Sequence, residues 1–311
     1  MPNWTAADIP RQDGRVAIIT GSNSGLGYHA ARELARAGAH TILACRDAGR
    51  GGAALERMQS ELPGASIELR LVDMASLDSI RAFAEGAPER VDLLLNNAGV
   101  MAPPRRETAD GFELQFGTNH HGPFALTGLL LSRLEAADAP RVVTASSNMH
   151  KMGGLNWADL QSEHKYRRWF AYGHSKLANL LFAFELQRRA TAAGSKLLSM
   201  AAHPGYAATE LHVKGARIGN ATFQERVMDL GVKLMAQSSA DGALPMLFAA
   251  TAPDVPGGSY VGPSKRMETV GPPKFTKGSG HSRNEADARR LWEISEQLSG
   301  VTYEFERAKV A

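Results

Sequence analysis

The stretch Ile18–Gly38 reads IITGSNSGLGYHAARELARAG and decides the fold. It begins inside the apolar run Val16–Thr20, which predicts a strand, and continues into an alanine-rich segment that predicts a helix. Between the two, Gly21, Gly25 and Gly27 are spaced G-x-x-x-G-x-G. A phosphate can approach backbone N–H groups where no Cβ intervenes, and the positive end of a helix dipole stabilises it there. The stretch therefore predicts a loop that binds nucleotide phosphates, rather than a turn that only connects a strand to a helix.

Length and composition fit one large soluble domain. The 311 residues are 43% hydrophobic, which is enough for a sizeable core, and residues 1–311 are expected to form a single domain. The 35 basic and 32 acidic residues nearly cancel, so no electrostatic argument for a nucleic-acid partner arises. Cys45 is the only cysteine, which excludes an internal disulfide and suits a reducing cytosol. The sequence has no signal-peptide run and no apolar run of about 18 residues, so we expect a cytoplasmic protein without a membrane span.

Short apolar runs alternate with longer helical patterns along the chain, which is typical of a parallel β-sheet with crossover helices. The expected strands are Val16–Thr20, His40–Cys45, Ser66–Val72, Val91–Leu95, Arg141–Ala145, Lys196–Ala202 and a short one at Ser259–Val261. The expected helices are Gly25–Ala37, Gly49–Leu62, Ser76–Gly86, Gly111–Leu134, Trp169–Ala193, Ala240–Ala250 and Asn284–Leu298. The pattern predicts an α/β fold built on a doubly wound parallel sheet of about seven strands.

Two segments break this alternation. Leu211–Gln237 is rich in apolar side chains and is expected to cover the substrate end of the site, which would favour a lipophilic substrate. The alternative is that this segment packs on the sheet or at the subunit interface of a homo-oligomer. Pro253–Gly280 is rich in glycine and proline and is expected to be a loop. The core of the domain is expected at 15–262, followed by a C-terminal loop and helix at 263–311.

The end of the second strand discriminates between NAD and NADP in doubly wound nucleotide-binding folds. The sequence there is LACRD, in which the neutral Cys45 is followed by Arg46 and Asp47. A guanidinium offers a fork of donors to a 2′-phosphate, whereas a carboxylate binds a ribose 2′-hydroxyl. Arg46 therefore predicts that NADP(H) is preferred, while Asp47 leaves NAD(H) possible.

Further polar residues follow the third and the fourth expected strands. Asp73 comes just after the third strand in LVDMAS, and Asn96–Asn97–Ala98–Gly99 comes just after the fourth in LLLNNAGVM. Each group alone could be ordinary turn chemistry. Open α/β sheets bind ligands at the carboxyl ends of their strands, so these residues and the glycine loop together indicate one crevice.

Candidates for acid–base chemistry occur at the same edge of the sheet. Ser146 and Ser147 follow the fifth strand, and Tyr172 and Lys176 are spaced i, i+4 on the next long helix, so their side chains share one face. A phenol has a pKa of about 10, and a nearby ammonium favours its ionised form. Tyr172 could then take a proton from an alcohol, or give one to a carbonyl, as a hydride moves.

Several phrases occur together and in order: TGSNSGLG, NNAG, FGTNHHGPF, the serine pair, AYGHSKLAN and HPGYAATEL. With them the chain resembles the short-chain dehydrogenase/reductase family, in particular its retinol dehydrogenase-like group, from roughly Arg15 to Tyr260. The resemblance implies a Rossmann-type fold. It also implies an NADP-dependent oxidoreductase that transfers a hydride between nicotinamide and a carbonyl or alcohol of a lipophilic small molecule.

The resemblance implies roles for individual residues. Among the catalytic ones, the helix of Asn119 holds a water of the proton relay, and Ser147 binds the carbonyl oxygen. Tyr172 is the acid/base, and Lys176 lowers its pKa and binds the nicotinamide ribose. The residues implied to bind the cofactor are Gly21, Asn23, Ser24, Gly25, Leu26, Gly27, Arg46, Asp73, Met74, Asn97, Ala98, Gly99, Tyr172, Lys176, Pro204, Gly205 and Thr209.

Other kinds of function are less consistent with the sequence. A metal mechanism is not expected, because His120 and His121 belong to no Cys/His cluster with ligand spacing. His174, between the tyrosine and the lysine, is expected to be a packing or surface residue. A sugar-nucleotide epimerase or dehydratase typically has a G-x-x-G-x-x-G loop and a larger C-terminal domain, whereas the loop here is G-x-x-x-G-x-G. The alternative is a non-catalytic NADP-binding sensor or scaffold with the same fold, which the presence of serine, tyrosine and lysine disfavours.

Overall fold

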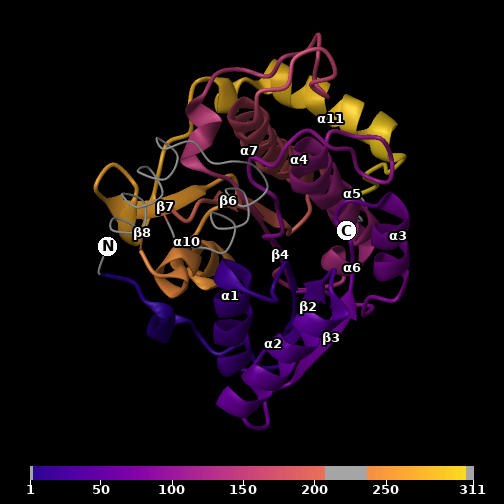
Figure 1. Ribbon diagram of the computed structural model, residues 1–311. Helices are drawn as coiled ribbons and strands as arrows, with labels where there is room; N and C mark the ends of the chain where they lie inside the picture. The colour runs from indigo at the N-terminus through magenta and orange to yellow at the C-terminus, as the bar shows by residue number, and fades with distance from the viewer. Residues whose placement is uncertain (1–2, 207–236, 306–311) are drawn as a thin grey trace, which may run out of the picture.

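The computed structural model of the chain describes residues 3–206 and 237–305. Two sequence predictions fall outside this part of the chain: the role of Thr209 and, apart from Gln237, the substrate-covering segment Leu211–Gln237. In the described residues, one eight-stranded sheet forms the centre of the molecule and helices cover both of its faces (Figure 1). No helix within these ranges is both long enough and apolar enough to cross a bilayer.

The chain enters the sheet at its centre. The strand order is β3-β2-β1-β4-β5-β6-β7-β8, and all neighbours from β3 to β7 are parallel. The strands are β1 (Val16–Thr20), β2 (His40–Cys45), β3 (Ile67–Leu71), β4 (Leu93–Asn96), β5 (Arg141–Ala145), β6 (Leu198–Ala202), β7 (Tyr260–Lys265) and β8 (Val270–Phe275). The chain winds outward from β1 to β3 and then crosses to β4, so the carboxyl ends of β1 and β4 flank a switch point, where such sheets bind ligands. The predicted doubly wound parallel sheet is confirmed.

The last strand corrects the sequence prediction. β8 pairs antiparallel with β7 at the edge of the sheet, so the predicted loop over Pro253–Gly280 is wrong for the residues of these two strands. The sheet has eight strands, where about seven were expected. Pro272 and Pro273 give this strand the composition of a loop. An edge strand tolerates proline because one side of its backbone donates to no neighbour.

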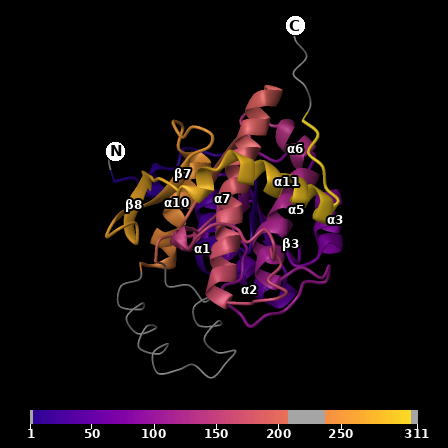
Figure 2. The same cartoon turned by 90° about the horizontal axis from the view of Figure 1, so that it is seen from above.

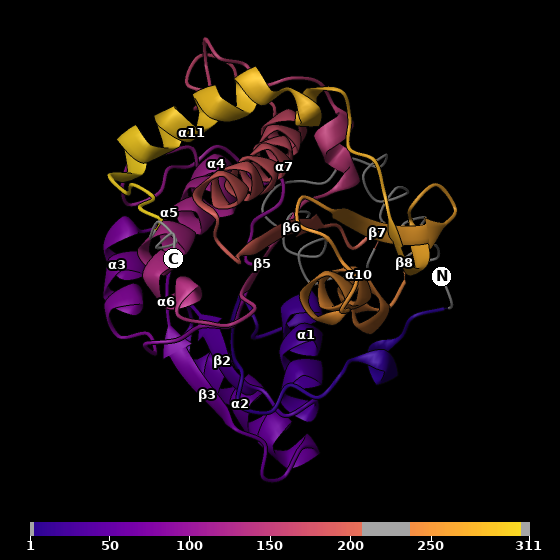
Figure 3. The ribbon, with the colours of Figure 1, turned by 180° about the vertical axis from the view of Figure 1, so that it is seen from behind.

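The helices form two layers. One face of the sheet carries α1 (Gly25–Arg36), α2 (Ala48–Glu61) and α10 (Ser239–Thr251), and the other carries α3 (Leu77–Glu85), α5 (Gly122–Leu129) and α7 (Arg168–Ala193). The final helix α11 (Glu285–Ser299) runs across the outside of α7 (Figure 2; Figure 3 shows the same contact from behind). There Trp292 of α11 stacks on Phe182 of α7, with ring centroids 5.9 Å apart.

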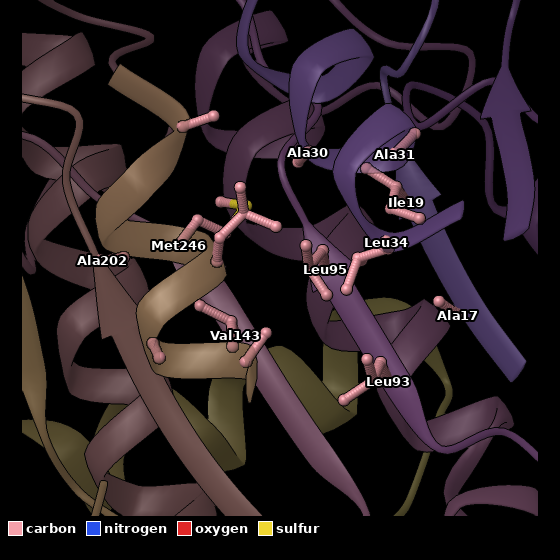
Figure 4. Packing of buried hydrophobic residues seen from close by; sticks show 14 of the residues in the cluster. Ala17, Ile19, Ala30, Ala31, Leu34, Leu93, Leu95, Val143, Ala202 and Met246 are labelled. Carbon is pink, nitrogen blue, oxygen red and sulfur yellow. The ribbon is translucent and has the colours of Figure 1, made fainter. Parts of the chain in front are cut away.

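Alternation along the central strands places apolar side chains in both layers. Ala17 and Ile19 of β1 point toward Leu34 of α1, together with Leu95 of β4 (Figure 4). Ile18 points to the opposite face and joins the cluster under α5 and α7. Since both faces are buried, the strands read as continuous apolar runs. This is why their bounds follow from the sequence so closely.

The predicted helix Gly111–Leu134 is broken in the structure. It consists of α4 (Leu114–Phe116), a π-helical turn η2 (Gly117–His121), α5 and α6 (Leu131–Glu135). The π-helical turn contains Asn119, whose side chain is bound to a neighbouring loop rather than to its own helix. A tertiary hydrogen bond that pulls on one residue can force such a local change, and π-helical turns are frequent at functional sites.

Candidate active site

The glycine loop and the loop after β4 are joined by hydrogen bonds. The Thr20 hydroxyl accepts from the backbone N–H groups of Asn97 (3.0 Å) and Ala98 (2.9 Å), and the Asn97 amide donates to the Thr20 carbonyl (2.8 Å). A Cβ at Gly27 would lie 2.5 Å from the Asn97 amide nitrogen, so only glycine fits there. The two loops therefore form one backbone surface at the carboxyl end of the sheet, as predicted for the crevice.

The start of α1 fits a phosphate group. Ser24 occupies the N-cap position but its side chain makes no capping hydrogen bond, so it leaves the N–H groups of the first turn to other acceptors. Residues 23–26, which include the predicted contacts Asn23, Gly25 and Leu26, are partly accessible, whereas Gly27 is buried against the neighbouring loop. An uncapped helix start in a glycine loop is a suitable anion site.

The residues after β2 separate the two predictions for cofactor choice. The Asp47 carboxylate caps α2 by accepting from the Arg50 N–H at 2.8 Å. Arg46 is largely exposed, with its guanidinium 3.9 Å from a carboxylate oxygen of Asp73. The Asn23 amide oxygen, turned toward the Arg50 guanidinium, accepts from it at 3.1 Å and 3.3 Å. The sequence prediction missed Arg50, although its position four residues after Arg46 was a usable signal.

The two predicted cofactor contacts after β3 differ in exposure. The Asp73 side chain is about one-third exposed (36%), and its carboxylate accepts from the Ala75 N–H at 3.0 Å. Met74 is buried, and its carbonyl oxygen would lie 2.5 Å from a Cβ at Gly122. The Asp73 carboxylate therefore lies at the open edge of the sheet, and the side chain of Met74 belongs to the core.

The two serines after β5 have different partners. The Ser146 hydroxyl is buried and donates to the backbone carbonyl of Lys176 at 2.8 Å, which ties the end of β5 to α7. The Ser147 hydroxyl accepts from the Met149 N–H at 3.2 Å and lies close enough to Tyr172 to lower the pKa of its phenol. Since its lone pair is engaged, Ser147 can direct its hydrogen toward the phenol or a substrate oxygen. The structure thus brings Ser147 and Tyr172 together and gives Ser146 a structural contact.

Burial controls the ionisation of the tyrosine–lysine pair. The Lys176 ammonium lies 5.6 Å from the centre of the Tyr172 ring and donates to the Ala145 carbonyl at 3.2 Å. Burial lowers the pKa of Lys176 to about 8. Burial also raises the pKa of Tyr172 to about 12, against a smaller lowering by the hydrogen bond from Ser147. Burial dominates, so the phenol is protonated at neutral pH, and a lowering of its pKa by Lys176 stays a prediction.

Asn119 is fully occupied by hydrogen bonds. Its amide oxygen accepts from the Val100 N–H (2.7 Å), and its amide nitrogen donates to the Val100 carbonyl and to the Ser175 hydroxyl (both 2.9 Å). The side chain thus joins the loop after β4 to α7. Any contact of this residue with a water of a proton relay would have to come from the backbone of η2, so that role stays a prediction.

Pro204 and Gly205 follow β6 in a turn that other segments hold. The Gln237 amide donates to the Pro204 carbonyl at 2.7 Å, and the Gly205 N–H donates to the His203 ring at 3.2 Å. Gly205 has φ +65°, and a Cβ there would lie 2.3 Å from the Thr269 carbonyl oxygen, so glycine is required. This turn lies at the carboxyl end of the sheet, as Ser147 does.

His120, His121 and His174 are packing residues. His120 is buried and pairs with the Ser295 hydroxyl at 2.9 Å, while burial lowers the pKa of His121 to about 3. His174 is half-buried, and burial lowers its pKa as well. Among residues 3–206 and 237–305, no group of three or more histidine, cysteine or acidic side chains is arranged to hold a metal ion.

Comparisons with known proteins agree with this geometry. The family model described as short chain dehydrogenase matches residues 15–217. The chain is 39% identical to retinol dehydrogenase 12 of Mus musculus, over 96% of this chain and 90% of that protein. It is 38% identical to polyprenol dehydrogenase of Mus musculus, over 94% and 86% respectively.

Solved structures are similar over most of the chain. A protein of Mycobacterium paratuberculosis whose function is uncharacterized shares 44% identity, with a TM-score of 0.80 over 97% of this chain and all of that one (100%). A protein from Beutenbergia cavernae, solved with NADP bound at low occupancy, shares 25% identity with a TM-score of 0.60, over 78% and 91% of the two chains.

Proposed function

Because the chain belongs to the short-chain dehydrogenase/reductase family, in its retinol dehydrogenase-like group, we propose that it interconverts a carbonyl and an alcohol of a lipophilic small molecule with NADP(H). The observation that carries the reaction type is that Ser147 lowers the pKa of the Tyr172 phenol and that the Lys176 ammonium lies 5.6 Å from the Tyr172 ring, at the end of the sheet that also carries the uncapped start of α1. The residues proposed to bind the nucleotide and those proposed for acid–base chemistry thus lie at the carboxyl end of the same sheet.

The side chains supply the proton and the orientation of the substrate. The nicotinamide cofactor, when bound, supplies or accepts the hydride. In reduction, Ser147 donates a hydrogen bond to the substrate carbonyl oxygen, and Tyr172 transfers its phenolic proton to the same oxygen as the carbonyl becomes an alcohol. Lys176, when protonated, stabilises the resulting phenolate electrostatically. Oxidation runs through the same groups in reverse.

A preference for NADP(H) is supported by the residues after β2. The Asp47 carboxylate is engaged as the N-cap of α2, whereas the Arg46 guanidinium is exposed beside the predicted adenosine site. Arg50 lies against Asn23 in the glycine loop, which adds a second positive charge nearby. Two guanidinium groups suit a 2′-phosphate dianion better than a ribose hydroxyl.

A lipophilic substrate is supported by apolar side chains beside the turn after β6. Tyr206 is 42% exposed and Met267 is 93% exposed. A hydrogen bond of 2.8 Å from the Tyr206 N–H to the Thr269 carbonyl joins the turn after β6 to the β7–β8 turn, which also contains Met267. The turn that carries Met267 contacts the segment after Ser147, since the Asn148 amide donates to the Glu268 carbonyl at 3.3 Å, and apolar side chains that line a site favour an apolar ligand. Retinol and polyprenol, in the names of the two mouse relatives, are alcohols of this kind.

The experiment is turnover of a panel of ketones, aldehydes and lipid alcohols with NADPH and NADH in separate series. We expect NADPH-dependent reduction to be fastest with long apolar carbonyl compounds. Tight NADPH binding without turnover of any panel member would favour the alternative, a non-catalytic NADP-binding sensor or scaffold. Equal rates with small polar and large apolar carbonyl compounds would contradict the lipophilic assignment.

A further inference from the structure

His150 connects the catalytic serine to the C-terminal part of the chain. Its ring is buried (1% exposed), with Nδ1 2.6 Å from the Ser147 carbonyl oxygen and Nε2 3.1 Å from the Ser279 backbone nitrogen. The edge of the ring also packs against Tyr260, with centroids 5.6 Å apart and planes at 84°. Every polar atom of this side chain therefore has a defined partner.

The two partners allow only one form of the imidazole. A carbonyl oxygen can only accept, so Nδ1 must carry a hydrogen, and a backbone N–H can only donate, so Nε2 must be without one. A protonated ring would direct an N–H group at the N–H of Ser279. Burial lowers the pKa of His150, which agrees with a neutral ring. The geometry thus fixes both the charge and the tautomer of His150.

These bonds act on the peptide group of the catalytic residue. The Ser147 carbonyl accepts twice from His150, from its ring and from its backbone N–H at 3.0 Å. The carbonyl of Ser147 is thus held by His150, and its hydroxyl is held by the Met149 N–H. The direction of the Ser147 side chain therefore depends on both contacts.

The short helix η3 (Asn148–Lys151) is held at the same time by the turn between β7 and β8. The Asn148 amide donates to the Glu268 carbonyl at 3.3 Å, and the Lys151 ammonium bonds the Glu268 carboxylate at 3.4 Å. The segment after Ser147 is thus attached to two C-terminal segments, the β7–β8 turn and the turn at Ser279. Among the contacts between the described residues, the attachment through His150 is the one that reaches the Ser147 carbonyl.

We propose that His150 is a positioning residue for this reaction: as the neutral, Nδ1-protonated imidazole it fixes the peptide group of Ser147 and links it to Ser279, so that the serine hydroxyl faces Tyr172. The proposal rests on the proposed function, because it assumes that Ser147 binds the substrate oxygen. A misplacement of about 1 Å at a reacting group can lower the rate roughly 10²-fold. His150 acts through Ser147 and needs no contact with substrate.

Two amide substitutions separate the two hydrogen bonds of His150. The amide nitrogen of Asn overlays the Nδ1 position, so H150N keeps the donor to Ser147 and loses the bond to Ser279. The amide oxygen of Gln reaches the Nε2 position, so H150Q keeps the acceptor for Ser279 and loses the donor to Ser147. We expect H150Q to lower kcat roughly ten- to a hundredfold and H150N to retain at least about a third of it. In both variants the Kd for NADPH should stay within about threefold of wild type.

The matched control is H40Q. His40 is at the amino end of β2, at the end of the sheet opposite to Ser147. Its ring Nδ1 lies 2.7 Å from the Ser66 hydroxyl oxygen. Its substitution should change neither kcat nor Kd. Thermal unfolding of all three variants gives the fraction that is folded in each assay.

A measurement without turnover keeps the test independent of the assigned function. In the wild-type protein labelled with ¹⁵N-histidine, NMR should find the ring of His150 neutral and protonated at Nδ1, with its signal identified by its loss in H150N. An Nε2-protonated or cationic ring would overturn the proposal. So would equal losses of kcat in folded H150N and H150Q, or an unchanged kcat in folded H150Q. If the ring has the expected form but wild type turns over no carbonyl compound, the proposed function fails and, with it, the positioning role.

Discussion

The Lys176 ammonium nitrogen lies 5.6 Å from the centroid of the Tyr172 ring and donates to the Ala145 carbonyl at the end of β5. The helix that carries the pair is thereby attached to the strand that precedes the catalytic serine. The position of the proton donor relative to Ser147 is therefore set by contacts between α7 and β5.

Removing the phenolic hydroxyl tests the proton donor. We expect Tyr172→Phe to lower kcat by roughly 10²–10⁴-fold, because it removes the proton donor of the proposed mechanism. Cofactor binding should be nearly intact, since the ring is retained, and titration of the protein with NADPH measures this. Turnover within tenfold of wild type would remove Tyr172 from the mechanism.

The two adjacent serines should respond differently to substitution. Ser147→Ala removes a hydrogen-bond donor to the substrate oxygen and should lower kcat by roughly 10²–10³-fold. Ser146→Ala leaves the buried Lys176 carbonyl without its donor and should lower the free energy of unfolding by about 1–3 kcal/mol. Its effect on kcat should be below about tenfold. Steady-state kinetics and urea unfolding of both variants check the assignment, and the reverse pattern would exchange the two roles.

The buried lysine should make stability depend on pH in a defined window. Lowering the Lys176 pKa from 10.5 to about 8 corresponds to about 3 kcal/mol. Between these values the unfolded chain binds the proton that the folded chain has lost, so the free energy of unfolding contributed by this group rises with pH. Below pH 8 the folded state carries the whole cost of the buried charge.

Lys176→Met tests this dependence. The variant should be more stable than wild type at pH 7, and the difference should shrink between pH 8 and about 10.5. Turnover should be lost at every pH, since no ammonium faces the phenol. The measurement is urea unfolding of both proteins, without cofactor, across this range. A constant difference in stability would mean that Lys176 titrates at its ordinary pKa when folded.

The exposed arginine after β2 should determine cofactor choice. Arg46→Ala should weaken NADPH binding roughly ten- to a hundredfold and leave NADH binding nearly unchanged, because a charge-assisted contact contributes about 1.5–3 kcal/mol. Arg57→Ala is a matched control, since Arg57 lies on α2 and pairs with Glu61 at 2.8 Å. Fluorescence titrations with the two nucleotides give two dissociation constants for each protein. Tighter binding of NADH than of NADPH by wild type would assign the ribose contact to Asp47 instead.

Sequence patterns predicted the bounds of those strands and the position of that loop which depend on neighbouring residues in the chain. β1, β2 and β5 have the predicted bounds, because strands buried on both faces read as uninterrupted apolar runs. The glycine spacing located the loop before α1, because only glycine tolerates the contact with the loop after β4. β8 was missed because its prolines have the same composition in an edge strand as in a loop.

The sequence by itself determined which strands carry the polar residues and that Ser147, Tyr172 and Lys176 meet at one edge of the sheet. The tertiary structure alone decided the pKa of Tyr172, the structural role of the Asn119 side chain and the different partners of the two serines. It also decided the contact of His150. The physical reason is that burial and hydrogen-bond partners come from distant segments: Ser146 bonds a residue 30 positions away, and His150 one 129 positions away. Periodicity and spacing describe only neighbours along the chain, so they contain no information about such pairs.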